Sequence, residues 1–259
     1  MKTVIANWKM NVGVRESVAL ARASLLTLRG RKVIPELVIC PPFVALSEVR
    51  KVVARSSVAI GAQNLFWEPT GSYTGETSSR QLQELGVSHV IIGHSERRVH
   101  LGETDEMVNK KVLHALSEQM TPVLCVGESK AQRDAGEARV LVEAQLVMAL
   151  RGVRLHGGGH LFVAYEPVWA IGAGESASVG DVIEMHRFIR SILANLFPDT
   201  PAGQIAILYG GSVDGQNAYS FLRESEVDGV LVGGASVKIN QFKEIVEAAA
   251  EVLEAQRSE

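Results

Sequence analysis

The chain has 259 residues, of which 46% are hydrophobic and 21% charged, and its mean hydropathy is +0.12. This composition excludes an intrinsically disordered chain, which would combine low hydrophobicity with a high net charge, and it is enough for one large domain or two small ones. Because 26 Lys and Arg face 29 Asp and Glu, the net charge is −3. The chain therefore lacks the basic excess that a nucleic-acid partner requires.

The same composition indicates a cellular compartment. The apolar stretch near the start is interrupted by Asn7 and Lys9, which makes it too short for a secretory signal. No run approaches the ~18 apolar residues of a membrane-spanning helix. Cys40 and Cys125 are too few for a disulfide framework and suit a reducing compartment, where we expect them to be packed core thiols. We therefore expect a soluble, cytoplasmic protein with no membrane partner.

Eight short runs rich in Val and Ile predict eight strands, at residues 3–7, 37–40, 58–63, 89–93, 122–127, 161–166, 205–209 and 229–233. Their apolar residues continue without strict alternation, which is typical of strands buried on both faces. Segments with helical spacing lie between them, and Ser178 with Asp181 predicts the start of one helix. Eight strand–helix units fill residues 1–259 as a single domain, and this alternation requires parallel strands.

Two architectures fit this alternation: an open doubly wound sheet, and a closed eight-stranded barrel of about 250 residues. The runs end in small or polar residues, among them Asn7, Lys9, Gln63, Asn64, His94, Ser95, Glu166, Gly233 and Gly234. In a closed barrel the carboxyl ends of all strands meet on one face, whereas an open sheet would spread them along an edge. We therefore predict an α/β protein with a (β/α)8 barrel.

Glu166 is the candidate general base. It ends the sixth run and precedes Pro167, which favours an extended backbone at Glu166 and prevents a helix from starting there. The apolar, glycine-containing residues 168–174 follow, and a carboxylate that they cover would lose water and be suited to take a proton. The local sequence fits a solvated glutamate before a turn equally well.

His94 follows the fourth run and precedes a helix. The helix dipole disfavours a cationic ring at that end, so a neutral imidazole there is suited to donate a hydrogen bond. A structural histidine is the competing interpretation for His94, and it is the one we expect for His100, His114 and His186. No two histidines have the spacing of metal ligands, so no metal site is predicted.

Lys9 and Asn7 end the first run. Two residues apart on a strand, they are expected to share one face, and Lys9 would place a positive charge beside the carboxylates of the same mouth. A lone lysine also fits an ordinary surface position.

Glycine pairs follow the seventh and eighth runs: Gly210 and Gly211, with Ser212 next, and Gly233 and Gly234. Bare backbone N–H groups at these two positions form the usual phosphate site of a (β/α)8 barrel. A tight turn explains one such pair, whereas two pairs and a serine favour a phosphate dianion.

Residues 172–177 (GAGESA) match the G-x-G-x-x-A pattern of dinucleotide-binding proteins. The acidic ribose ligand, expected about 20 residues later, should end a second strand, but residues 188–195 have helical spacing. We therefore reject a nucleotide site and predict no cofactor.

Five motifs in chain order resemble those of the triosephosphate isomerase family: residues 7–11 (NWKMN), 93–98 (GHSERR), 165–172 (YEPVWAIG), 209–213 (YGGSV) and 228–236 (DGVLVGGAS). Together they extend over most of the chain. The resemblance implies a TIM barrel that interconverts dihydroxyacetone phosphate and D-glyceraldehyde 3-phosphate through an enediolate, without a cofactor.

The resemblance also implies a role for each site residue. Glu166 would be the base that moves a proton between C1 and C2, and neutral His94 the electrophile that polarises the carbonyl. Lys9 and Asn7 would stabilise the negative oxygen, with Glu96 near Lys9. The phosphate would be held by the backbone amides of Gly172, Ser212, Gly233 and Gly234.

By the same resemblance, residues 167–177 form a lid that excludes water and is latched by Tyr209 and Ser212 onto Ala177 and Gly174. Where the family often has G-T-G-K-T-A, this chain differs at three positions, Ala173, Glu175 and Ser176. We expect these differences to leave the chemistry intact and to alter the opening and closing of the lid.

Residues 63–77 are long for a connection between a strand and a helix, which marks a functional segment or a solvated surface loop. The resemblance implies that residues 64–77 insert into a second subunit and brace its Asn7 and Lys9. We therefore expect a homodimer.

Three other functions fit parts of the sequence. The barrel and phosphate site suit another reaction, such as epimerisation of a pentose phosphate or an indole-forming cyclisation, although such epimerases need metal ligands that this mouth lacks. Residues 172–177 alone suit a dinucleotide-binding module. An inactive structural relative is disfavoured because Glu166, His94 and Lys9 are all present. The leading hypothesis is a cofactor-free isomerase of a triose phosphate.

Overall fold

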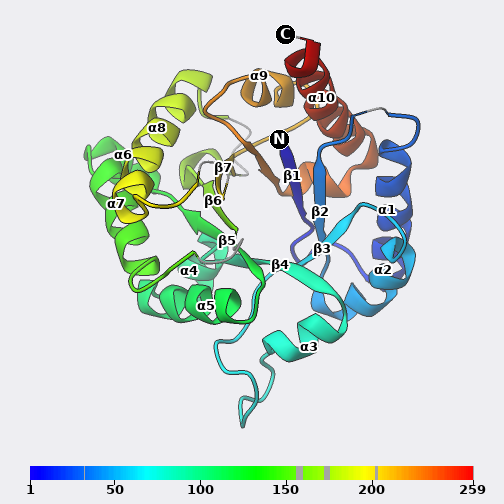
Figure 1. Cartoon of the computed structure of the whole chain (residues 1–259), viewed down its shortest axis with the longest axis horizontal. Helices are drawn as coiled ribbons and strands as arrows, with labels where there is room; N and C mark the ends of the chain where they lie inside the picture. The colour runs from blue at the N-terminus through cyan, green and yellow to red at the C-terminus, as the bar shows by residue number, and fades with distance from the viewer. Residues whose placement is uncertain (32, 156–159, 172–175, 202–203, 259) are drawn as a thin grey trace.

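The structure of the chain, a computed structural model, describes residues 1–31, 33–155, 160–171, 176–201 and 204–258. Eight parallel strands form a closed barrel in sequential order, and helices surround it (Figure 1). The strands are β1 (Thr3–Asn7), β2 (Glu36–Cys40), β3 (Ala59–Ala62), β4 (Val87–Ile92), β5 (Thr121–Val126), β6 (Leu161–Tyr165), β7 (Ile205–Tyr209) and β8 (Gly229–Val232). The predicted α/β fold with a (β/α)8 barrel is confirmed.

The described helices lie between the strands and after the last one. They are α1 (Val14–Thr27), α2 (Leu46–Val53), α3 (Ser79–Glu84), α4 (Ser95–Leu101), α5 (Asp105–Ser117), α6 (Lys130–Asp134), α7 (Ala138–Ala149), α8 (Val179–Leu196), α9 (Ala218–Leu222) and α10 (Ile239–Ser258). Short 3-10 helices occupy η1 (Phe43–Ala45), η2 (Val168–Ala170) and η3 (Gly234–Val237). As predicted, Ser178 caps α8, and its hydroxyl accepts from the Asp181 N–H at 3.1 Å. No helix in the described part of the chain is long and apolar enough to cross a membrane.

The barrel wall separates two parts of the hydrophobic core. On β1, Ile5 packs inside the barrel, whereas Val4 and Ala6 pack between the sheet and the helices. This alternation explains why the apolar runs continue without polar positions: both faces of each strand are buried. Cys40 and Cys125 are free thiols packed inside the barrel, as predicted.

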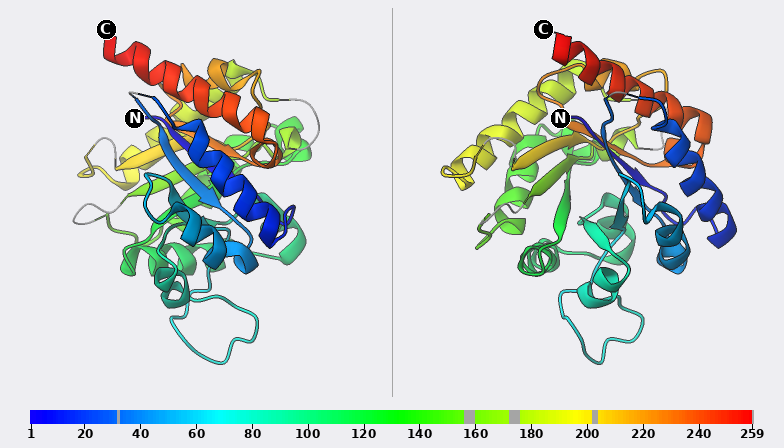
Figure 2. Two further views of the ribbon diagram at one scale, coloured as in Figure 1. Left: turned by 90° about the vertical axis from the view of Figure 1, so that its right-hand side faces the viewer. Right: turned by 45° about the vertical axis from the view of Figure 1, so that its right-hand side comes forward.

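The segment between β3 and α3 projects from the body of the molecule. Figures 1 and 2 show it as a long loop that extends beyond the ring of helices. Its start is fixed by a buried contact, because the Lys111 ammonium donates to Asn64 Oδ1 at 2.7 Å and to Glu103 Oε2 at 2.7 Å. The segment is therefore anchored to α5 at its base and free of the barrel at its tip.

His186 on α8 is a structural histidine, as predicted. It is fully buried, its Nδ1 lies 3.1 Å from the carbonyl oxygen of Glu226, and its ring meets the Tyr165 ring edge-on at 6.2 Å. A carbonyl only accepts, so Nδ1 carries the proton. Within the described residues Nε2 has no hydrogen-bond partner. Burial accordingly lowers the pKa of His186 to about 4.

This pKa predicts a specific acid sensitivity. The unfolded chain protonates His186 near pH 6.5 and the folded chain only near pH 4, so the folded state loses stability as pH falls through this interval, and above it His186 has no effect. The loss between pH 7 and pH 5 is about 2 kcal/mol. In urea titrations at these two pH values, His186→Gln should lose about 2 kcal/mol less of its free energy of unfolding than the wild type. His100→Gln, on α4, is the control and should behave as the wild type. Equal losses in the wild type and His186→Gln would contradict this explanation.

Candidate active site

A cavity of about 840 Å³ opens at the carboxyl ends of the strands. It is lined by the loops that follow β1, β4, β6, β7 and β8. Every described site residue that the sequence predicted lines it: Asn7, Lys9, His94, Glu96, Glu166, Ser212, Gly233 and Gly234. The remaining predicted residue, Gly172, lies outside the described residues. The closed barrel therefore brings together, on one face, positions that are far apart in sequence.

His94 and Glu166 are in direct contact at the floor of this cavity. Nε2 of His94 lies 3.1 Å from Oε1 of Glu166, and both side chains are buried. The other ring nitrogen, Nδ1, accepts from the Glu96 N–H at 3.2 Å. A ring that accepts on Nδ1 and donates from Nε2 is neutral. His94 is also the residue that caps α4, so the hydrogen bond and the helix dipole favour the same uncharged state.

The carboxylate of Glu166 is held at the amino end of α4. Its second oxygen, Oε2, accepts from the Ser95 N–H at 2.8 Å. The backbone at Glu166 is fixed as well, because its N–H donates to the carbonyl of Val126 at 2.7 Å. Only glycine fits at position 127, where a Cβ would lie 1.7 Å from the carbonyl oxygen of Glu166. The base candidate is thus a buried carboxylate stabilised by two N–H groups.

Lys9 reaches the cavity by a different route from the one predicted. β1 ends at Asn7, and Lys9 adopts a left-handed backbone with φ 52°, so the expectation that the two side chains share a strand face is wrong. A left-handed backbone is unfavourable for residues other than glycine, and hydrogen bonds to the backbone of Lys9 stabilise it here. The Lys9 N–H donates to Asn7 Oδ1 at 3.1 Å, and Gln63 Nε2 donates to the Lys9 carbonyl at 2.9 Å.

The ammonium of Lys9 lies 2.5 Å from Oε1 of Glu96. Burial alone would raise the pKa of Glu96, but the hydrogen bond and charge of Lys9 outweigh it and hold that pKa below its usual value. The pair carries no net charge. It holds the ammonium at the mouth of the cavity that His94 and Glu166 also line.

Glycine backbone forms another part of the cavity lining. Gly211 and Gly234 line the cavity, and in the described part of the chain no hydrogen-bond partner is found for their amides. Gly233 has a further reason to be glycine, because a Cβ there would lie 3.1 Å from Cε of Lys9. Ser212 also lines the cavity, and its hydroxyl donates to the carbonyl of Ala170 at 2.5 Å. Such amides suit an anion with several oxygens.

The segment that the resemblance identifies as a lid is described only in part. The Ala177 N–H donates to the Tyr209 hydroxyl at 3.3 Å, which is one of the two expected latches. The expected contact of Ser212 with Gly174 falls on residues 172–175, outside the described ranges, as do Ala173 and Glu175. The dinucleotide-like pattern at 172–177 lies mostly in the same gap.

Three residues near the site were not predicted as site residues from the sequence: Gln63, Ser95 and Glu128. Gln63 and Ser95 were named only as polar residues at strand ends. Glu128 is fully buried, and its Oε1 accepts from the Tyr165 hydroxyl at 3.1 Å and from Trp169 Nε1 at 2.7 Å, so it holds both sides of the Glu166 segment. All three follow the end of an apolar run, which is the signal that identified Asn7 and His94. Their partners are backbone groups or side chains distant in sequence, which no local pattern reveals.

Two other chemistries can be assessed from the same geometry. Burial, together with the nearby Glu166 carboxylate, raises the pKa of the Cys125 thiol well above its usual value, so this thiol stays protonated and does not compete as a base. Among the residues that the structure describes, no group of three or more His, Cys, Asp or Glu could hold a metal ion.

Comparison with known proteins gives a consistent result over the whole chain. A family model described as triosephosphate isomerase matches residues 2–249. A relative named triosephosphate isomerase from Thermoanaerobacter sp. (strain X514) is 45% identical over 243 residues, covering 94% of this chain and 97% of the relative. The protein of the same name from Caldanaerobacter subterraneus subsp. tengcongensis is 46% identical with the same coverage. That from Roseiflexus castenholzii is 45% identical over 93% of this chain and 94% of its own length.

The matched residues 2–249 include all five sequence motifs. The chain belongs to the triosephosphate isomerase family.

Proposed function

We propose that this chain interconverts dihydroxyacetone phosphate and D-glyceraldehyde 3-phosphate by proton transfer through an enediolate. Family membership and the names of the relatives support this reaction. The observation that carries the assignment of residues is the contact between a neutral imidazole N–H and a buried carboxylate, 3.1 Å apart, in a cavity that glycine backbone also lines. That combination supplies a base, an electrophile and an anion site.

The proton transfer follows from this contact. The carbonyl oxygen of the substrate replaces Oε1 of Glu166 as the acceptor of the hydrogen bond from the Nε2–H of His94. The carboxylate then removes a proton from the carbon beside the carbonyl. The electrons of that C–H bond form the C=C bond of the enediolate, and the carbonyl electrons move to oxygen. His94 gives its Nε2 proton to the former carbonyl oxygen and takes the proton of the neighbouring hydroxyl, whose oxygen becomes the new carbonyl. The C=C electrons then take the proton from Glu166, now a carboxylic acid, at the former carbonyl carbon.

The charge that develops on oxygen needs fixed donors. His94 supplies a neutral N–H, and Lys9 supplies an ammonium that its ion pair with Glu96 holds in place. Asn7 adds its amide at the end of β1. We assign Asn7 and Lys9 to enediolate stabilisation and Glu96 to positioning Lys9. The reaction draws on these protein groups alone, so no cofactor is part of the proposal.

The phosphate of the substrate is assigned to the backbone wall. Ser212, Gly233 and Gly234 line the same cavity as Glu166, and Gly172 completes the set of amides by the family resemblance. A dianion bound there anchors the triose at one end and leaves its two reacting carbons at the carboxylate.

Three inferences stay predictions from the sequence: one domain over residues 1–259, a cytoplasmic location and the absence of a nucleic-acid partner.

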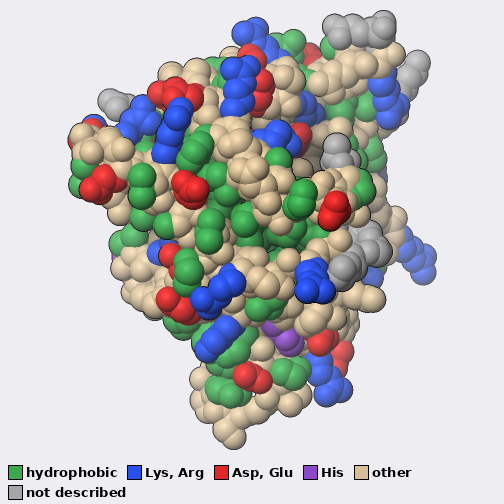
Figure 3. Space-filling view, turned by 60° about the vertical axis from the view of Figure 1, so that its left-hand side comes forward, with side chains coloured by type: hydrophobic (Ala, Val, Ile, Leu, Met, Phe, Trp, Pro, Cys, Tyr) green, Lys and Arg blue, Asp and Glu red, His purple; other side chains and the backbone are tan. Residues whose placement is uncertain are grey.

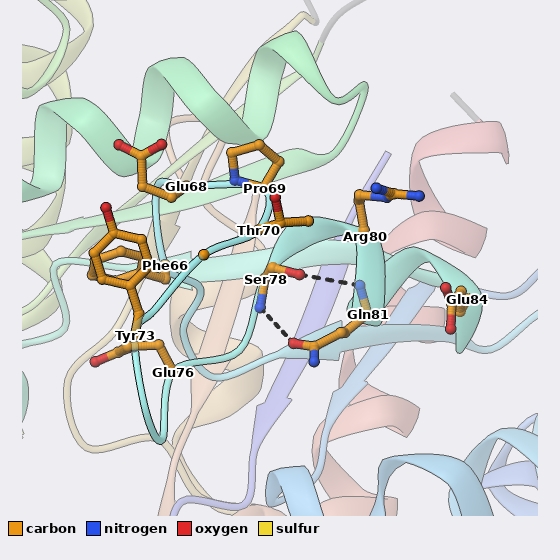
Figure 4. Close-up of a pocket in the computed structure, with 11 residues that line it drawn as sticks. Phe66, Glu68, Pro69, Thr70, Tyr73, Glu76, Ser78, Arg80, Gln81 and Glu84 are labelled. Atoms are coloured by element: carbon orange, nitrogen blue, oxygen red, sulfur yellow. Dashed lines mark hydrogen bonds between the residues drawn. The ribbon is translucent and has the colours of Figure 1, made fainter.

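We also propose that the protein is a homodimer joined through residues 64–77. The loop has a firm shape of its own: the Phe66 ring lies 4.2 Å from the Trp67 ring and 4.5 Å from the Tyr73 ring, and Figure 4 shows Phe66 and Tyr73 side by side. Ser78 and Gln81 form a reciprocal cap where the loop enters α3. Tyr73 nevertheless remains 46% exposed.

Further apolar side chains are exposed on the loops that follow β1 and β2. Met10, next to Lys9, is 96% exposed, and Val44 is 76% exposed. Large exposed apolar side chains gathered near a projecting loop are typical of a protein interface. In the proposed dimer the loop of each subunit covers these side chains on the other and thereby restrains Lys9.

Replacing the base without changing its shape tests the reaction. Glu166→Gln keeps the shape of the side chain and one of its two acceptor oxygens but cannot accept the proton, so we expect kcat to fall by about 10²–10⁴-fold. Binding of glycerol 3-phosphate, measured by calorimetry, should change little because the phosphate contacts remain. Glu143→Gln, an exposed glutamate on α7, is the matched control.

The assay follows dihydroxyacetone phosphate in D₂O by proton NMR, with chelator present and no nucleotide. The wild type and Glu143→Gln should form glyceraldehyde 3-phosphate. Near-normal turnover by Glu166→Gln would assign the base to another group, and an inactive wild type would overturn the proposed reaction itself.

Sedimentation equilibrium tests the dimer. At micromolar concentration the wild type should have twice the 27.9 kDa mass of one chain. Met10→Glu buries a charge in the proposed interface and should shift the protein toward the monomer. Val147→Glu places the same charge on the exposed side of α7 and should leave the mass unchanged. A wild-type monomer, or an equal effect of both substitutions, would count against this interface.

A further inference from the structure

A second cavity, of about 270 Å³, lies behind Glu166. It is bounded by α4, by the connection from β5 to α6, and by α7, and it is separate from the large cavity at the mouth of the barrel. Of the described residues that line the two cavities, only Glu166 is common to both. Its carboxylate therefore forms part of the partition between them.

The two oxygens of Glu166 bond to different sides of this partition. Oε1 contacts His94, which lines the large cavity and not the second one. Oε2 accepts from the Ser95 N–H, and Ser95 lines the second cavity and not the large one. A substrate bound against His94 covers the carboxylate from the front and leaves the rear side open.

The walls of the second cavity suit water better than a specific ligand. The guanidinium of Arg98 is already bonded to Asp105 and to the carbonyl of Gly93, and the Gln145 amide is bonded at both ends to the backbone of Gly127. These polar groups are therefore not left to recognise an anion or a sugar. A water molecule occupies about 30 Å³ of liquid, so the space holds several.

The cavity reaches the protein surface. Val99, at its rim on α4, is 66% exposed, and Leu141 on α7 is half-buried. The face formed by α6, α7 and α8 carries hydrophobic side chains between charged ones (Figure 3). Water that enters beside Val99 and Leu141 therefore passes between apolar side chains before it meets the carboxylate.

We propose that this second cavity is the route by which the proton held on Glu166 exchanges with solvent while substrate occupies the front of the site. The inference rests on the proposed function, in which Glu166 becomes a carboxylic acid after it takes the substrate proton. In D₂O the acid O–H gives its proton to a water in the cavity and receives a deuteron in return. The acid then delivers the deuteron to carbon, so exchange with solvent and direct return to carbon compete for the same proton.

Filling the cavity tests the route. Leu141→Trp and Val99→Trp narrow it from opposite walls, and Val140→Trp, on the exposed side of α7, is the matched control. Dihydroxyacetone phosphate is converted in D₂O, and proton NMR gives the fraction of glyceraldehyde 3-phosphate with deuterium at C2. We expect this fraction to fall at least threefold in both filled variants, with kcat and KM within twofold of the wild type. A merely structural defect would change kcat or KM and leave the deuterium fraction alone.

The outcomes separate this proposal from the reaction on which it rests. A wild type that does not convert the substrate overturns the reaction. A wild type that converts it without deuterium at C2, or folded filled variants with the wild-type deuterium fraction, overturns the route and leaves the reaction standing. Thermal denaturation checks that each variant is folded. If Leu141→Trp does not fold, the deuterium fraction of Val99→Trp tests the route, because Val99 lies mostly outside the core.

Discussion

The amino end of α4 is the constraint on which the rest of the site depends. A carboxylate buried without a neighbouring cation is costly, and Glu166 is kept there by the Ser95 N–H and the Nε2–H of His94. The first residues of this short helix thus orient the base, Glu166, and set the tautomer of His94. The barrel supplies the other half of the constraint, because β4 and β6 both pair with β5 in parallel register. That register brings residues 94 and 166 to the same level.

A buried network extends this constraint outward. Glu103 accepts from the Gly93 N–H at 3.0 Å and also from Arg97 and Lys111, and Lys111 in turn donates to Asn64 at the base of the projecting loop. The turn before His94 and the start of the loop therefore share one set of buried charges. Because removing one partner of a buried ion pair is much more costly than losing an exposed one, these two regions are fixed together.

Much of the fold and of the site could be predicted from the sequence, and the physical reasons for this also explain which features could not be predicted. Strands buried on both faces leave continuous Val-rich and Ile-rich runs, so the strands were predicted to within two residues at most ends. Polar residues at strand ends identified Asn7, His94 and Glu166. The left-handed backbone of Lys9 could not be predicted, because it depends on Gln63 reaching across from β3. Nor could the second cavity, since its shape depends on how α4, α7 and the connection from β5 to α6 pack together, which no local pattern reveals.

The loop of residues 64–77 has one further consequence. Its aromatic rings stack on one another, the Phe66 N–H donates to the Thr77 carbonyl at 2.9 Å, and the Lys110 ammonium lies 5.2 Å from the centre of the Trp67 ring. The segment thus already has a defined shape in an isolated chain. Preorganisation of this kind reduces the conformational entropy lost on association. Two subunits can then associate as rigid bodies, and no loop has to fold when they meet.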